Sequence, residues 1–98
     1  MSTSYTLEHE SGYEDDELVI EDKGWYDGLT ILVGAMRYKP TFYNPSCFKV
    51  MCEGQLALYP AEVAPNAVFV RSVTRANIEA AVEYLASIGF RGLTPEPQ

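Results

Sequence analysis

The stretch that decides the fold runs from Asn66 to Phe90 and reads NAVFVRSVTRANIEAAVEYLASIGF. Its first part, residues 67–73, is β-branched and aromatic, as expected of a half-buried strand. Its second part carries apolar residues at i, i+3, i+4 and i+7, which are Ile78, Ala81, Val82 and Leu85. Thr74 fits the N-cap of a helix, and Gly89 fits the left-handed residue that ends one. We therefore predict a strand followed directly by an amphipathic helix at about 75–88.

Upstream of this unit, the residue patterns predict short strands joined by polar loops. Residues 5–8 and 17–21 are typical of strands, and the charged stretch 10–17 is typical of a solvated loop. We expect the acidic segment 1–16 to be partly mobile and residues 94–98, which include two prolines, to form a frayed tail. The 98 residues predict a single domain, 1–98, with one modest core.

The middle of the chain predicts a loop followed by a β-hairpin. Pro40 and Pro45 bracket a short stretch that is typical of a turn. Residues 47–52 and 55–59 are largely apolar runs that flank Glu53-Gly54, a two-residue hairpin signal.

Residues 25–39 fit two interpretations. A helix would align Trp25, Leu29, Leu32, Val33 and Met36 on one stripe. A strand is favoured by the β-forming run 30–33 and by two glycines, each of which costs a helix interior about 1 kcal/mol. The strand interpretation predicts an α+β domain in which a small antiparallel sheet carries the C-terminal helix on one face. The alternative, with a second helix at about 25–38, is a ferredoxin-like βαββαβ fold.

The net charge of −7 is confined to the first third of the chain. Residues 1–28 contain nine acids and one base, whereas residues 29–98 contain five acids and six bases. Such a surface repels nucleic acid and anionic membranes and attracts basic partners. We therefore expect a basic protein as the partner, with no direct binding of nucleic acid and no membrane association.

The sequence offers little for catalysis or metal binding. We expect the single histidine, His9, to be a solvated surface residue, and Cys47 and Cys52 to be free thiols that are too few for a structural zinc site. The acidic run 14–17 lacks the alternating pattern of a calcium loop. No signal peptide and no apolar stretch of about 18 residues is evident. These observations predict a cytoplasmic protein that is not an enzyme and has no cofactor, catalytic residue or metal site.

Aromatic residues interleaved with the acids suggest a protein-binding surface, because carboxylates steer a basic partner and aromatic side chains anchor an interface. The predicted partner-binding residues are Glu8, Glu10, Tyr13, Glu14, Asp15, Asp16, Glu17, Glu21, Asp22, Trp25, Tyr26 and Asp27. We expected Tyr13 to be the exposed anchor of this set.

Two functions follow as expectations. The first is a small acidic inhibitor that occupies the basic surface of a nucleic-acid-binding or nucleic-acid-cutting protein. Anti-CRISPR, anti-restriction and nuclease-immunity proteins work in this way, and the chain shares their acidic character but none of their motifs. The second is a structural or assembly protein, such as a phage particle component, that acts through self-association.

Overall fold

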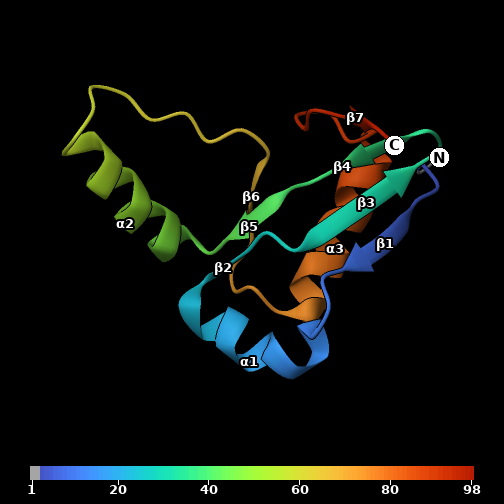
Figure 1. Cartoon of the computed structure of the whole chain (residues 1–98), viewed down its shortest axis with the longest axis horizontal. Helices are drawn as coiled ribbons and strands as arrows, with labels where there is room; N and C mark the ends of the chain where they lie inside the picture. The colour runs from blue at the N-terminus through green and yellow to red at the C-terminus, as the bar shows by residue number, and fades with distance from the viewer. Residues whose placement is uncertain (1–2) are drawn as a thin grey trace.

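Three helices and two small sheets make up this α+β protein, whose computed structural model describes residues 3–98 (Figure 1). The first sheet has the antiparallel order β1-β3-β4-β7, formed by β1 (Thr6–His9), β3 (Leu29–Val33), β4 (Met36–Tyr38) and β7 (Glu96–Pro97). The second sheet has the order β2-β5-β6, formed by β2 (Trp25–Tyr26), β5 (Thr41–Tyr43) and β6 (Ala67–Phe69). The helices are α1 (Tyr13–Lys23), α2 (Pro45–Leu56) and α3 (Arg75–Ser87).

The predicted C-terminal helix is confirmed as α3. The backbone N–H of Asn77 donates to Thr74 Oγ1 at 3.2 Å, so Thr74 caps the first turn as expected. At the other end Gly89 has a φ of 66°, and the N–H of Phe90 donates to the carbonyl of Leu85 at 2.7 Å. This is the hydrogen-bond pattern of a Schellman motif. Phe90 itself also takes a positive φ, of 59°.

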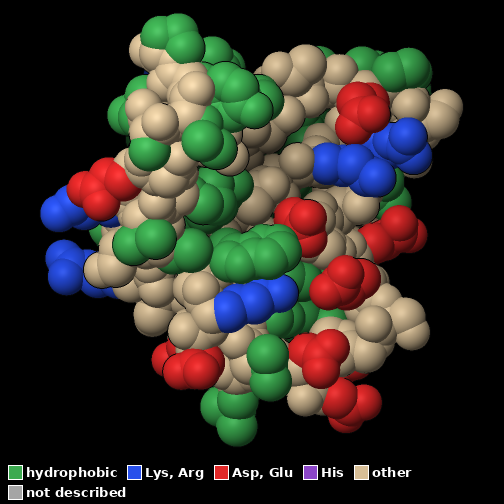
Figure 2. Space-filling model, turned by 60° about the vertical axis from the view of Figure 1, so that its left-hand side comes forward, with side chains coloured by type: hydrophobic (Ala, Val, Ile, Leu, Met, Phe, Trp, Pro, Cys, Tyr) green, Lys and Arg blue, Asp and Glu red, His purple; other side chains and the backbone are tan. Residues whose placement is uncertain are grey.

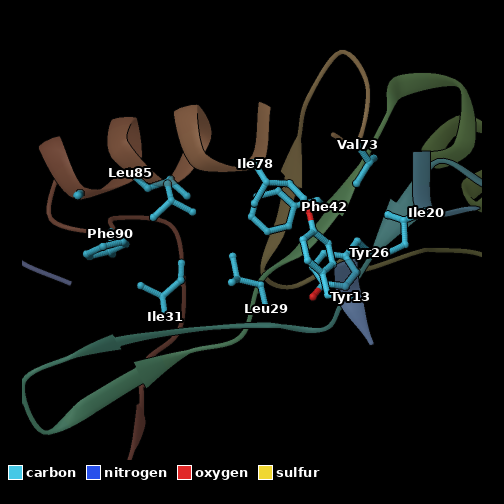
Figure 3. Packing of buried hydrophobic residues seen from close by; sticks show 12 residues of the cluster. Tyr13, Ile20, Tyr26, Leu29, Ile31, Phe42, Val73, Ile78, Leu85 and Phe90 are labelled. Carbon is cyan, nitrogen blue, oxygen red and sulfur yellow. The ribbon is translucent and has the colours of Figure 1, made fainter. Parts of the chain in front are cut away.

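The core lies between α3 and β3, as Figure 3 shows. From α3 it receives Ile78, Val82, Leu85 and Ala86, of which the first two are completely buried. Its other members come from β3, from the strands of the second sheet and from the segments beside them: Tyr13, Ile20, Tyr26, Leu29, Ile31, Phe42, Val73 and Phe90. The C-terminal helix that the sequence predicted on one face of the sheet therefore covers it, as expected.

Residues 25–39 are strands, so the favoured interpretation is confirmed and the ferredoxin-like alternative is wrong. They form β2, β3 and β4, with β3 and β4 joined as a hairpin by a turn at Gly34. Gly34 has a φ of 59°, a conformation that glycine adopts without strain. The run 30–33 was the signal that predicted β3 correctly.

The strand predicted at 17–21 is wrong, and the loop predicted at 10–17 is wrong from residue 13 onward, because Tyr13–Lys23 form α1. Glycines with positive φ, Gly12 and Gly24, flank this helix at its two ends. Its first turn is acidic and its last turn contains Lys23, as the helix dipole favours. Only Tyr13 and Ile20 on α1 are buried, and this spacing of seven residues is two turns of one helix face.

The β-hairpin predicted across 47–59 is also wrong, because most of it is α2. Asn44 Oδ1 accepts the N–H of Cys47 at 2.7 Å and Pro45 begins the helix, a favourable N-terminal arrangement. The loop predicted at 40–45 instead contains β5. None of the residues of α2 is buried, and the helix extends away from the sheets (Figure 1).

Both terminal segments contain regular elements within the described residues 3–98. The strand expected at 5–8 is confirmed as β1, an edge strand, and α1 begins at Tyr13, so residues 6–9 and 13–16 belong to regular elements. Within residues 94–98, where a frayed tail was predicted, β7 pairs with β4 and the side-chain amide of Gln98 donates to the carbonyls of Gly34 and Met36. Proline is tolerated in β7 because this strand lies at a sheet edge.

Candidate functional site

The acids of the N-terminal third fall into two groups. The first group lies on α1, whose outward residues form a surface that we call the acidic face: Glu14, Asp15, Asp16, Leu18, Val19, Glu21 and Asp22. All seven are exposed, because Tyr13, Glu17, Ile20 and Gly24 occupy the opposite side of the helix. The structure thus brings five of the predicted partner-binding carboxylates onto one helix surface.

Two aliphatic side chains lie in the middle of the acidic face. Leu18 is 81% exposed and Val19 is 61% exposed. Helical spacing of three and four residues places Glu14, Asp15, Glu21 and Asp22 around Leu18. Leu18 and Val19 were not among the predicted partner-binding residues, because residues 17–21 resemble a strand. The signal that points to them is the helical spacing of three and four residues between Leu18 and the acids on either side of it.

Glu17 does not belong to the acidic face, although it was among the predicted partner-binding residues. Arg75 is the first residue of α3. Its Nε–H donates to Glu17 Oε1 at 2.9 Å, and its Nη2–H donates to Glu17 Oε2 at 3.0 Å. This paired contact with the guanidinium lowers the pKa of the Glu17 carboxyl. Glu17 therefore links α1 to α3, and its role in partner binding stays a prediction.

Tyr13 and Tyr26 are core residues, so the expectation that Tyr13 is an exposed anchor is wrong. They are 2% and 1% exposed, and their ring centroids lie 5.0 Å apart. Burial raises the pKa of Tyr26 to about 12. Tyr13 can bury because the charged residues of α1 turn to the other side, except Glu17, which is paired with Arg75.

His9 is also held by this aromatic cluster and is not the solvated residue that the sequence predicted. Its ring stacks on Tyr13 with centroids 3.9 Å apart, and its Nδ1 lies 3.0 Å from the hydroxyl of Tyr26. The guanidinium of Arg75 covers the Tyr13 ring at 5.1 Å. Burial, and then the nearby charge of Arg75, lower the pKa of the imidazole. The cluster joins β1, α1, β2 and α3 at one point.

The second group of acids contains Glu8, Glu10 and Asp27. These three are exposed around a shallow hollow that Lys39 and His9 also line. Trp25, another predicted residue, is half-buried, and the ammonium of Lys23 lies 3.9 Å from the centroid of its indole ring. Trp25, one of the aromatic residues predicted beside the acids, is therefore partly covered by Lys23.

Within residues 3–98, no three or more His, Cys, Asp or Glu side chains are grouped so that they could hold a metal ion. Cys47 and Cys52 are free thiols, as expected, but they lie on α2 and not on a strand. Five residues of helix rise about 7.5 Å, which exceeds the Cα separation of a disulfide. Across the same described residues, no helix is long and apolar enough to cross a bilayer.

Comparison of the chain with protein-family models, with curated proteins and with solved structures gave no match. The acidic face is therefore interpreted from its own geometry and chemistry.

Proposed function

We propose that this protein is a small acidic binding protein, not an enzyme, and that the acidic face of α1 contacts a basic surface of a partner protein. The observation that supports this proposal is the exposure of Leu18 and Val19 in the middle of the carboxylates. A helix that only kept the protein soluble would gain nothing from two exposed aliphatic side chains. An interface gains from them, because the buried centre of a protein interface is more apolar than its polar rim.

The two kinds of side chain would have different effects on binding. Carboxylates attract a basic surface over roughly 8 Å at physiological salt, so they should raise the association rate. Leu18 and Val19 would leave water only in the complex, so they should slow dissociation. Burying each of them could contribute about 1.5–3 kcal/mol.

The partner that fits this chemistry is a nucleic-acid-binding or nucleic-acid-cutting protein, because such proteins present basic surfaces. Occupation of that surface would exclude the nucleic acid, so the activity of the acidic protein would be competitive inhibition. This assignment rests on charge complementarity alone.

Affinity capture with matched baits tests the proposal. The wild-type protein, a Leu18→Ser/Val19→Ser variant and a Leu58→Ser variant would each be exposed to host lysate, and captured proteins identified by mass spectrometry at two salt concentrations. Leu58 is 75% exposed outside the acidic face, so it is the control for lost surface hydrophobicity. Because Leu58 also belongs to the α2 surface described below, light scattering checks that this variant keeps the oligomeric state of the wild type. Basic proteins held by the wild type and the control but released by the double variant support the proposal. Identical captured sets for all three baits contradict it.

Once a partner is identified, binding kinetics separate the two contributions. Glu14→Gln/Asp15→Asn/Glu21→Gln/Asp22→Asn should slow association and reduce its dependence on salt. Glu17 is left unchanged, since its loss would release Arg75. If this variant associates at the wild-type rate across salt concentrations, the carboxylates are not the steering group.

Self-association through α2 is a second candidate, supported by a different observation. β5 and β6 are parallel neighbours and α2 is the crossover between them, yet α2 does not cover their sheet. Figure 2 shows hydrophobic side chains gathered on the lobe at the upper left, where α2 projects. The exposed apolar residues of α2 and the segment after it are Val50, Met51, Leu56, Leu58, Tyr59 and Val63.

The surface area of the protein is also large for its size. The accessible surface is 6330 Å² for 10.9 kDa, whereas a monomer of this mass is expected to have about 5,600 Å². The excess, about 700 Å², is close to the ~800 Å² that one partner buries in a standard interface. Light scattering after size-exclusion chromatography would show a dimer that Val50→Ser/Leu58→Ser converts to a monomer. A wild-type monomer at every concentration would exclude this candidate.

A further inference from the structure

A groove of about 520 Å³ lies between β6 and α3, outside both surfaces discussed so far. One of its walls is formed by five successive residues, 67–71. Side chains of successive strand residues point to opposite faces, so all five can line one groove only if it runs along the edge of the strand. The opposite wall is a stripe of α3 at helical spacing, formed by Asn77, Ala80, Ala81, Tyr84 and Leu85.

The edge of β6 that borders the groove is open. β6 is the last strand of its sheet, in the order β2-β5-β6. Its hydrogen bonds to β5 include the carbonyl of Asn66, which accepts from Thr41, and the N–H of Val70, which donates to Tyr43. Backbone groups of successive strand residues point to alternate edges, so those of Ala67 and Phe69 point away from β5. The groove therefore contains the donors and acceptors that another strand would use.

The turn after α3 forms one end of the groove. Here the N–H of Thr94 donates to Asn66 Oδ1 at 2.7 Å, which brings this turn to the start of β6. Arg91 lies in this end wall, and Arg71 lines the groove at the other end of the strand. The one salt bridge within residues 3–98 joins Arg75 to Glu17, so neither groove arginine is paired with a carboxylate there. A protein of net charge −7 thus presents two unpaired cations at this groove.

We propose that the groove binds the C-terminal segment of a partner protein as an added strand, antiparallel to β6, with its terminal carboxylate at Arg91. The open strand edge would satisfy the backbone of the peptide, as in other β-augmentation sites. The end wall would stop the peptide, and the guanidinium of Arg91 would neutralise the charge where the chain ends. At about 3.3 Å per residue, the wall 67–71 accommodates about four or five residues.

The apolar part of the groove sets the side-chain preference. Val68, Val70, Ala81, Leu85 and Leu93 supply an apolar lining, so a peptide side chain that points inward should be aliphatic. A small carboxylic acid with an apolar tail could occupy the apolar part of the groove, but it would leave the backbone groups at the edge of β6 without hydrogen-bond partners. An extended peptide uses both features, which is why it is the preferred ligand. This site shares no residue with the acidic face, so it stands independently of the function proposed above.

A peptide library with free and amidated C-termini tests the proposal. The library would consist of heptapeptides tethered by their N-termini, with the last four positions randomised, and would be probed with the full-length protein. We expect binding to free-acid peptides with aliphatic residues near the C-terminus. Their amides should bind at least about tenfold more weakly. N-methylation of alternate backbone amides should abolish binding. Absence of binding to every free-acid peptide, or equal binding of acids and amides, overturns the proposal.

Two pairs of variants locate the bound peptide. Ala80 is exposed in the groove wall, so Ala80→Trp should fill the groove and abolish binding, whereas Ala76→Trp, exposed on α3 outside the groove, should bind normally. Arg91→Gln should remove the preference for acid over amide, and Lys49→Gln on α2 should retain it. Melting curves show whether each variant is folded. If Ala80→Trp melts like the wild type and still binds the peptide, the groove is not the site.

Discussion

Leu85→Ala and Leu18→Ala remove the same three carbon atoms from two helices, and we predict that only the first change destabilises the protein. Leu85 is 9% exposed in the core face of α3, whereas Leu18 is 81% exposed on α1. Full burial of these atoms contributes about 2.4 kcal/mol, at about 0.8 kcal/mol per methylene-sized group. The cavity left at Leu85 brings its expected cost to about 2–5 kcal/mol. Leu18 retains only about a fifth of the burial term, or roughly 0.5 kcal/mol.

Urea unfolding, followed by the fluorescence of the single tryptophan, Trp25, measures both free energies of unfolding. In a domain of this size the predicted losses lower the melting temperature by at least about 8 °C for Leu85→Ala and by under about 4 °C for Leu18→Ala. Because both substitutions are Leu to Ala within a helix, their effects on helix propensity should cancel. Equal losses in the two variants would refute the assignment of faces on α1 and α3. They would also weaken the argument that Leu18 is kept for binding.

Three further predictions concern titration and metals. Stability should fall as the pH is lowered from 7.5 to 5.5, because unfolded histidine, with a pKa of about 6.5, binds a proton more readily than folded His9, whose pKa is lowered. Urea midpoints should show a flatter dependence for His9→Gln, and an unchanged slope would contradict the buried position of His9. Glu17→Gln should lower stability at pH 7 and progressively less in acid, since the contribution of this carboxylate is lost as pH falls through its lowered pKa; a loss that does not change with pH would argue against the contact with Arg75. Dialysis against a chelator should leave the melting temperature unchanged, and a drop of several degrees would reveal a metal site.

The parts of the fold that were predicted from the sequence are those in which the pattern of apolar residues agrees with the burial of their side chains in the structure. α3 buries a regular apolar stripe, and its caps, Thr74 and Gly89, are visible in the sequence. β3 combines β-branched residues with alternate burial. In both elements the residues that are buried in the core follow the same periodicity as the apolar residues in the sequence.

Helices α1 and α2 were missed because their packing leaves little apolar periodicity. α1 buries only Tyr13 and Ile20, and α2 buries nothing, so neither shows a full stripe. The signals that were present lie at the helix ends: Asn44-Pro45 before α2, and the acidic first turn and Gly24 for α1. Reading the charges of α1 as a loop also led to the expectation that Tyr13 is exposed. The five carboxylates of the acidic face were predicted from the sequence. Their arrangement on one helix and the two aliphatic residues among them, Leu18 and Val19, were not.

At Phe90 the local backbone and the core favour different residues. A φ of 59° suits glycine or asparagine and costs another residue about 1–2 kcal/mol. The ring, however, is 2% exposed and lies 5.1 Å from Tyr38 and 6.1 Å from Tyr5, measured between centroids. Losing such a ring costs about 3–5 kcal/mol, so the core term is the larger one. Phe90 is thus a point of tolerated frustration in the energy landscape, and relieving its backbone strain with glycine would make the protein less stable.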